Sequence, residues 1–171
     1  MPDARIREIG PEDYPLLEEF LYLAVYQRDP AQPIPRSVID EPRVRNYIVD
    51  FGSRPDDRGL VAEVDGTVVG AAWARVLGGD PVGYGYVDDE TPELAISVLP
   101  EYRNRGIGTR LMLSLIDLLS ECGYARTSLS VDKANYAVKM YEALGFTVVA
   151  EQDEDNLMIR ELSQKDRPHA G

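Results

Sequence analysis

Residues 93–122 constrain the fold more than any other part of the sequence. Residues 93–99 have the composition of a short strand, and Pro100 ends it. A loop with two glycines follows, and residues 109–122 then repeat leucine at helical spacing. Because a strand and a helix each have an apolar face to bury, this order predicts a domain in which helices pack on a sheet.

The rest of the chain alternates between strand-like and helical patterns. Further strands are expected at residues 5–9, 60–64, 67–76, 127–131, 146–151 and 156–162, and further helices at 14–26, 42–51 and 134–144. Asp65-Gly66 joins two of these strands and is a strong hairpin signal. Residues 78–92 are rich in glycine and acidic side chains, which is typical of a long exposed loop.

These elements predict one α/β (α+β) domain over residues 1–163, with a mixed sheet of about six to seven strands and about four helices. The polar residues 164–171 are expected to form a mobile tail. No apolar run approaches the ~20 residues of a membrane span, and the amino terminus lacks the pattern of a signal peptide. The sequence therefore predicts a cytoplasmic protein with no membrane partner.

Charge and rare residue types argue against several functions. The chain has 18 Lys plus Arg against 30 Asp plus Glu, a net charge of −12, which argues against a nucleic-acid-binding protein. The single cysteine, Cys122, is expected to be a small buried residue, and the single histidine is His169, near the end of the chain. These counts argue against cysteine-rich or multi-histidine metal sites and against Ser-His-Asp or Cys-His catalysis. An enzyme built from this chain must use carboxylates, tyrosines, lysines or backbone groups.

The loop at residues 103–109 has the features of a site for an anionic ligand. A strand-to-helix junction leaves backbone N–H groups unpaired at the positive end of the helix dipole. Gly106 and Gly108 allow a phosphate to approach the backbone, and three arginines lie within eight residues of an otherwise acidic chain. The alternative is a tight turn whose arginines are only solvated. Two other phosphate motifs are absent: Leu111 replaces the third Rossmann glycine, and no Gly-Lys-Ser/Thr occurs.

Two motifs resemble those of the GNAT family of N-acetyltransferases. The first is Arg-x-x-Gly-x-Gly after a strand that ends in Val-x-Pro, which this chain has at residues 98–108. The second is Asn135, followed by a helix that ends in Tyr-x-x-x-Gly-Phe at residues 141–146. Both motifs occur in the family's order, and the resemblance covers about residues 4–162. It implies a mostly antiparallel sheet in which two strands splay apart to form a V-shaped slot for a cofactor.

The resemblance also implies acetyl-CoA as the cosubstrate, no metal, and a set of binding residues. The pyrophosphate of coenzyme A is expected on a loop made by Arg103, Asn104, Arg105, Gly106, Ile107, Gly108 and Thr109. Backbone groups of Ile96 and Val98 are expected to pair with the pantetheine arm like an added strand. Asn135 is expected to contact that arm or to fix the loop beside it.

The same resemblance suggests two catalytic residues, each with a structural alternative. Tyr141 occupies the position of a tyrosine that protonates the leaving thiolate, and it could instead be a core tyrosine on its helix. Glu93 is the only carboxylate within residues 93–99, so it is the candidate general base, although it could be only a polar strand end. The backbone N–H near Val98 is the expected oxyanion donor.

Two further groups of residues, one acidic and one aromatic, each have two possible roles. The acidic residues Asp88, Asp89 and Glu90 are expected in a solvated loop, where they could also line an acceptor entrance. Trp73, Tyr84 and Tyr86 are expected to pack or to anchor loops, with the wall of an acceptor pocket as the alternative.

The predicted function is transfer of an acetyl group from acetyl-CoA to a primary amine by direct attack in a ternary complex. One alternative is a coenzyme A-binding regulatory module without turnover. A second keeps the enzyme but changes the acceptor from a small-molecule amine to a peptide amine, either a protein amino terminus or a lysine. Exposed strands near the carboxyl end could pair across a twofold axis and form a homodimer.

Overall fold

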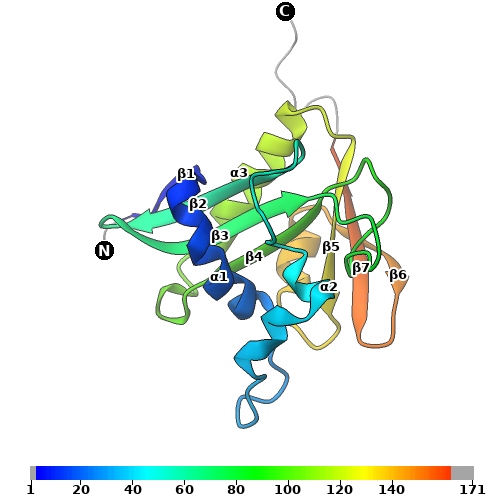
Figure 1. Cartoon of the computed structure of the whole chain (residues 1–171), viewed down its shortest axis with the longest axis horizontal. Helices are drawn as coiled ribbons and strands as arrows, with labels where there is room; N and C mark the ends of the chain where they lie inside the picture. The colour runs from blue at the N-terminus through cyan, green and yellow to red at the C-terminus, as the bar shows by residue number, and fades with distance from the viewer. Residues whose placement is uncertain (1–2, 163–171) are drawn as a thin grey trace, which may run out of the picture.

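The computed structural model describes residues 3–162, which form a seven-stranded sheet with the order β1-β2-β3-β4-β5-β7-β6 (Figure 1). The strands are β1 (Arg5–Glu8), β2 (Arg58–Val64), β3 (Thr67–Arg75), β4 (Glu93–Val98), β5 (Arg126–Asp132), β6 (Thr147–Glu151) and β7 (Asp155–Glu161). The helices are α1 (Leu17–Ala24), α2 (Pro42–Arg45), α3 (Ile107–Glu121) and α4 (Val138–Ala143). Short 3₁₀ turns occur at Pro11–Leu16, Arg36–Asp40 and Pro100–Tyr102. The predicted fold class is confirmed, and the expected tail at residues 164–171 lies outside the described residues.

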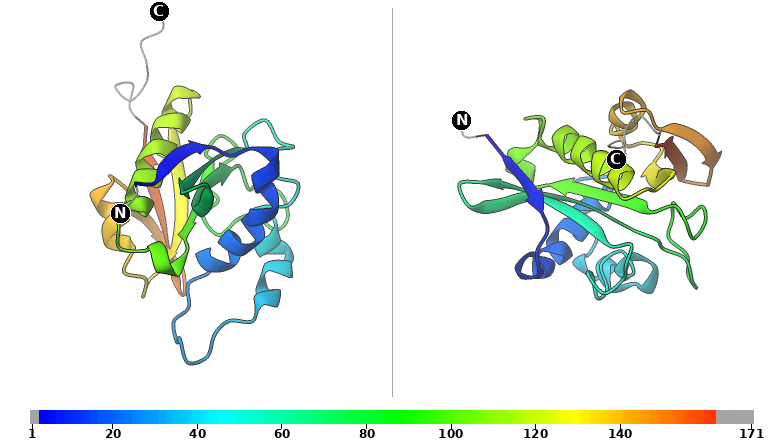
Figure 2. Two further views of the ribbon diagram at one scale, coloured as in Figure 1. Left: turned by 90° about the vertical axis from the view of Figure 1, so that its left-hand side faces the viewer. Right: turned by 90° about the horizontal axis from the view of Figure 1, so that it is seen from above.

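The helices cover both faces of the sheet, with α3 on one face and α1 and α2 on the other (Figure 2). Leucines at 111, 115 and 119 of α3 are fully buried, because their helical spacing puts them on one side, against the sheet. On the opposite face, Leu17 and Phe20 of α1 pack in a cluster with Trp73 of β3. Side chains along β3 point alternately to the two faces of the sheet, so this strand contributes to both apolar clusters. Ala72 belongs to the cluster with α3 and Trp73 to the cluster with α1.

The sheet splits between β4 and β5. β3 and β4 pair along all six residues of β4, but the parallel pair β4–β5 has a single register position, Glu93 with Ser128. Beyond Glu93 the two strands separate, which leaves one edge of β4 without a neighbouring strand. The expected V-shaped slot is therefore confirmed, and Glu93 lies at its closed end.

The hairpin at Asp65-Gly66 also forms as predicted. Both residues have a positive φ, 51° and 80°, and they connect the paired residues Val64 and Thr67 of β2 and β3. A two-residue turn of this kind needs left-handed backbone at both positions, which aspartate tolerates and glycine adopts readily.

The predicted helix over residues 42–51 is wrong beyond its first turn, because α2 ends at Arg45. The buried guanidinium of Arg75 contributes to the difference. It donates hydrogen bonds of 2.9 and 2.7 Å to the carbonyl oxygens of Asn46 and Val49, and the first of these is the acceptor that the N–H of Asp50 would use in a helix continuing to residue 51. The helices predicted at 14–26 and 134–144 are also shorter, at Leu17–Ala24 and Val138–Ala143.

Two expectations about exposure are corrected. The loop at residues 78–92 is not uniformly exposed, since Gly83, Gly85 and Thr91 are buried where it folds back over the start of β4. Cys122 is exposed rather than buried, because α3 ends at Glu121 and the thiol faces Arg58, whose Nε lies 3.2 Å from Sγ. Within residues 3–162, no helix has the length and apolar character needed to cross a membrane.

Candidate active site

The loop before α3 has the backbone conformation of an anion site. Gly106, the residue before α3, has φ of +80°, and Asn104 has φ of +63°. These left-handed residues turn the chain into α3, whose first N–H groups have no acceptor within the helix, as at the start of any α-helix. The loop borders a cavity of about 240 Å³, lined by Val98, Arg103, Asn104, Gly106, Ile107, Gly108, Thr109 and Met140. The geometry suits a phosphate held by backbone N–H groups at a helix start.

The arginines of this loop differ in their contacts. Arg103 is exposed and turns back, so that its Nε donates a 3.1 Å hydrogen bond to the carbonyl oxygen of Val98. Arg105 does not line the cavity, and its guanidinium lies 5.1 Å from the ring centroid of Tyr102. Both side chains keep positive charge close to the loop, but only Arg103 borders the cavity itself.

A second cavity of about 340 Å³ occupies the place where β4 and β5 separate. Four of the predicted site residues line it together: Glu93, Ile96, Asn135 and Tyr141. The Oδ1 atom of Asn135 accepts a 2.9 Å hydrogen bond from the N–H of Ala137, so this side chain orders the turn before α4. The structure thus divides the predicted residues between two cavities, one at the loop and one at the split.

The free edge of β4 presents alternate backbone groups to the split. The N–H of Leu99 donates to the carbonyl oxygen of Val69 in a 2.8 Å bond, so odd-numbered residues here face β3. Backbone groups alternate along a strand, and those of Ile96 and Val98 therefore point away from β3, toward the gap. An extended ligand lying in the split would meet these two residues.

Glu93 is enclosed although it is a carboxylate, with 2% of the residue exposed. Its Oε2 accepts a hydrogen bond from the hydroxyl of Tyr47, and its Oε1 has no hydrogen-bond partner among the described residues. Gly83 and Gly85 fold against this carboxylate, and a Cβ at Gly85 would lie 3.0 Å from Cδ of Glu93. Only residues without a side chain fit so close to the carboxylate.

The surroundings of Glu93 determine its pKa. Burial raises the pKa to about 7, against the opposing effects of the Tyr47 hydroxyl, the Gly85 N–H and the positive charge of Arg43. A carboxylate with a pKa near neutrality exists in both protonation states at the pH of a cell, which suits a general base. Glu93 is therefore more than a polar strand end.

Tyr47 is the main residue of this site that the sequence analysis missed. Its hydroxyl donates to Glu93 and accepts a 3.0 Å hydrogen bond from the N–H of Tyr84. Burial, and then the neighbouring charge of Glu93, raise the pKa of Tyr47 well above 10, so it stays a neutral donor. In the sequence it was only one apolar position of the helix expected at 42–51, and no local pattern links it to a residue 46 positions away.

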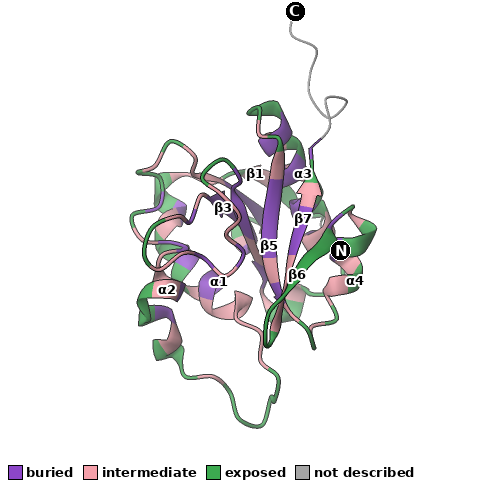
Figure 3. Ribbon diagram, turned by 90° about the vertical axis from the view of Figure 1, so that its right-hand side faces the viewer, coloured by how far each residue is buried: buried purple, intermediate pink, exposed green. Residues whose placement is uncertain are grey.

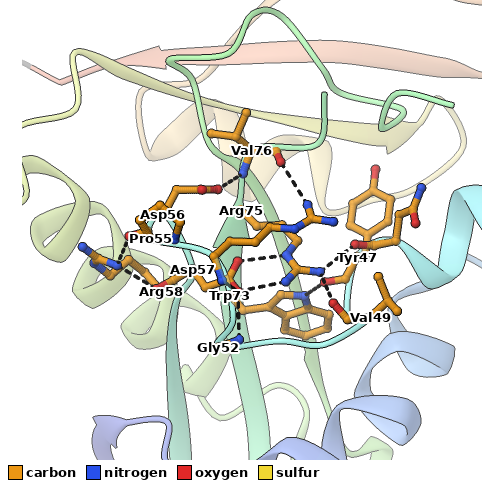
Figure 4. Close-up of polar contacts among 12 residues, drawn as sticks. Tyr47, Val49, Gly52, Pro55, Asp56, Asp57, Arg58, Trp73, Arg75 and Val76 are labelled. Atoms are coloured by element: carbon orange, nitrogen blue, oxygen red, sulfur yellow. Dashed lines mark hydrogen bonds and ion pairs between the residues drawn. The ribbon is translucent and has the colours of Figure 1, made fainter. Parts of the chain in front are cut away.

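A buried ion pair holds the segment that carries Tyr47 (Figure 4). Arg75 donates from Nε and Nη2 to the two carboxylate oxygens of Asp57, at 2.9 and 2.8 Å, and both side chains are almost fully buried. The indole N–H of Trp73 donates to the carbonyl oxygen of Tyr47 at 2.9 Å. With the bonds from Arg75 to Asn46 and Val49, these contacts fix the backbone on both sides of Tyr47.

Tyr141 faces the cavity from α4 and is 9% exposed. Its ring packs edge-on against Phe146, with 6.1 Å between centroids, so it is part of the core as well as of the cavity wall. Burial raises its pKa to about 12, which keeps the hydroxyl protonated at neutral pH.

The structure places the remaining aromatic and acidic candidates in different environments. Trp73 is a core residue with 1% exposed, and Tyr84 lines the larger cavity, whereas Tyr86 does not line it and donates to Asp89. Asp88 is not simply solvated, because it pairs with Arg126 at 2.5 Å and orders its own loop. Within the described part of the chain, no group of three or more His, Cys, Asp or Glu side chains is placed to hold a metal ion.

The split sheet, the loop at α3 and the buried carboxylate together define a domain that can hold a long anionic ligand beside a buried carboxyl group. Residues 21–146 match the model of the acetyltransferase (GNAT) family. The chain therefore belongs to the GNAT family, as the two sequence motifs predicted.

Individual relatives agree with this assignment. The mycothiol acetyltransferase of Thermobispora bispora is 40% identical over 94 residues, which are 52% of this chain and 29% of that protein. An uncharacterized N-acetyltransferase of Archaeoglobus fulgidus is 33% identical over 105 residues, 58% of this chain and 66% of that protein. The chain thus spans less than two thirds of the length of these curated relatives. PaiA N-acetyltransferase from Thermoplasma acidophilum, solved in complex with coenzyme A, shares the fold with a TM-score of 0.66 and 21% identity, covering 92% of this chain and 98% of that one.

Proposed function

We propose that this protein is an acetyl-CoA-dependent N-acetyltransferase that transfers the acetyl group to a primary amine by direct attack in a ternary complex. One observation carries the proposal: Glu93, with a pKa of about 7, and Tyr141, with a pKa of about 12, line the same cavity at the split of the sheet. Such a transfer requires one group that can accept a proton and another that is protonated and can give one. Family membership and the coenzyme A bound to PaiA support the choice of cosubstrate.

The binding residues fit an extended ligand with a phosphate group at one end. The pyrophosphate lies at the N–H groups of the loop from Arg103 to Thr109, which borders the smaller cavity. The pantetheine arm pairs with the backbone of Ile96 and Val98 on the free edge of β4, because unpaired strand groups need a hydrogen-bonding partner. At Val98 only the N–H is unpaired, since its carbonyl oxygen accepts from Arg103. Its thioester end then reaches the larger cavity beside Tyr141 and Asn135.

Each proposed catalytic group accepts a proton, donates a proton or stabilises a charge. Glu93 removes a proton from the ammonium form of the acceptor, whose nitrogen then attacks the acetyl carbonyl carbon. The N–H of Val98 donates to the oxyanion that develops there. As the carbon–sulfur bond breaks, Tyr141 gives its proton to the leaving thiolate. The attacking nitrogen loses its second proton to solvent as the amide forms. The proton on Glu93 also returns to solvent, and Tyr141 takes a proton back from solvent, so that each turnover releases one proton in all.

The test is release of free thiol from acetyl-CoA in the presence of a panel of amines, with coenzyme A protection against thermal unfolding measured in parallel. We expect both turnover and protection, since a ligand that binds only the folded state raises stability by mass action. Protection without turnover of any amine, peptide amines included, identifies a non-catalytic coenzyme A-binding module. If the protein shows no turnover and coenzyme A gives no protection, the proposal is rejected.

Two further features complete the proposal. β6 is exposed along its whole length (Figure 3), and Val148 and Val149 are 44% and 52% exposed. Pairing of β6 with β6 of a second copy across a twofold axis gives a homodimer that buries this apolar edge. Light scattering at increasing protein concentration tests for the dimer.

The cytoplasmic location expected from the sequence stays a prediction.

A further inference from the structure

We infer that the acceptor is a small primary amine with an apolar body and without a carboxylate or phosphate group. The inference rests on the proposed acetyl transfer, because it assigns the acceptor to the same larger cavity. Three properties of this cavity carry it: the sign of its charges, the unpartnered oxygen at its closed end, and the shape of its apolar wall.

All the charged side chains that line the cavity within residues 3–162 are acidic. They are Glu41, Glu93, Asp132, Glu154 and Asp155, and no Lys, Arg or His is among the lining residues described. Two arginines lie close to these acids, Arg28 beside Asp132 and Arg43 near enough to Glu93 for its charge to act on that carboxylate, and both are already paired with groups of the protein. Arg28 pairs with Asp132 at 2.9 Å, and Arg43 stacks on the ring of Tyr84 while donating to the carbonyl oxygen of Val82. An anionic group on the acceptor would lose its hydration here and find no free cation, whereas an ammonium is attracted.

The closed end of the cavity carries an acceptor for that ammonium. Oε1 of Glu93 is buried and no group among the described residues donates to it with hydrogen-bond geometry, although the Gly85 N–H is near enough to the carboxylate to lower its pKa and the sister oxygen is held by Tyr47. A buried carboxylate oxygen normally has a partner, so an unpaired one in a cavity indicates a ligand group that donates to it. An ammonium supplies such N–H donors, and the same contact lets Glu93 take the proton.

Part of the wall consists of branched apolar side chains. Val25, Ile34, Val38 and Val44 come from the segment around α1 and α2, opposite the β4 strand. The stacked rings of Tyr47 and Tyr84, 6.5 Å apart, continue this wall toward Glu93. At about 340 Å³, the cavity is near the lower end of the ~300–1,000 Å³ typical of small-molecule sites, and the thioester takes part of it. An aralkyl or alkyl amine fits this space better than a peptide.

The first experiment compares two acceptors that differ only in one carboxylate. We expect kcat/KM for 2-phenylethylamine to exceed that for phenylalanine by at least about 100-fold, since the added carboxylate is buried without a partner. Putrescine, which lacks an apolar body, and a short peptide with a free amino terminus complete the panel. A phenylalanine rate within tenfold of the amine, or a faster reaction with putrescine or with the peptide, overturns the inference.

The second experiment changes a charge at the cavity without touching Glu93 or Tyr141. Glu41 is exposed and lines the cavity, while the neighbouring Asp40 is exposed and does not. Glu41→Arg should lower kcat/KM for 2-phenylethylamine by about threefold to tenfold and reduce the preference over phenylalanine, whereas Asp40→Arg should change either value less than twofold. Equal effects of the two substitutions count against the electrostatic part of the inference.

Failure of this inference is distinguishable from failure of the proposed function. If coenzyme A protects the protein from unfolding and another class of amine is acetylated, the acceptor assignment is wrong and the acetyltransferase stands. If coenzyme A gives no protection and no amine releases thiol, the proposed function itself is wrong.

Discussion

Replacing Tyr47 by phenylalanine tests the idea that a tyrosine far away in the sequence sets the pKa of Glu93. The hydroxyl of Tyr47 donates to the carboxylate of Glu93 and so favours its ionised form. Burial nevertheless raises the pKa of Glu93 to about 7. Removing the hydroxyl takes away an interaction that lowers the pKa, so the pKa of Glu93 in Tyr47→Phe must rise further.

The size of the effect follows from the type of bond. A hydrogen bond to a charged group contributes about 1.5–3 kcal/mol, and about 1.4 kcal/mol corresponds to one pH unit. The acidic limb of the kcat/KM profile should therefore move up by about 1–2 pH units. At pH 7 the ionised fraction falls from about one half to between about 10% and 1%, so turnover should drop by roughly 5-fold to 50-fold and recover at higher pH.

The assay is a pH–rate profile of both proteins with the same amine, so that ionisation of the substrate cancels in the ratio. Tyr86→Phe is the matched control, because it also removes a tyrosine hydroxyl that donates to a carboxylate, Asp89, but lies outside the cavity. Circular dichroism establishes that both variants are folded. An unchanged midpoint in Tyr47→Phe, a shift to lower pH, or an equal shift in Tyr86→Phe refutes the reasoning.

Three other predictions address the acid, the phosphate loop and the buried ion pair. Tyr141→Phe should lower turnover by about 10²-fold while acetyl-CoA affinity changes little; a stability loss with turnover nearly intact would make Tyr141 purely structural. Gly106→Asp should abolish thermal protection by coenzyme A, because it adds a Cβ and a negative charge at a position with φ of +80°; full protection in a folded variant contradicts the loop assignment. Asp57→Ala should cost about 3–5 kcal/mol in urea unfolding, since it leaves Arg75 buried and unpaired, and a loss below about 1 kcal/mol would show that the pair is not needed.

The local features of this protein were predictable because short stretches of chain encode them. The leucine spacing of α3 and the left-handed turn at Asp65-Gly66 depend on residues within one helix or one hairpin. The order of the elements and the two motifs then identified the family and, with it, the split between β4 and β5.

The environment of Glu93 was not predictable in the same way, because it depends on segments that are distant in the sequence. Tyr47 meets Glu93 through tertiary contacts, and hydrogen bonds from Arg75 to the carbonyl oxygens of Asn46 and Val49 hold the backbone on both sides of it. Gly83 and Gly85 enclose the carboxylate because their loop folds back over β4. The periodicity of a sequence indicates which face of a helix or strand is apolar. The burial and the pKa of a side chain such as Glu93 depend instead on which helices, strands and loops pack around it. The sequence by itself therefore determined the elements and the family, and the tertiary structure decided the chemistry of the carboxylate.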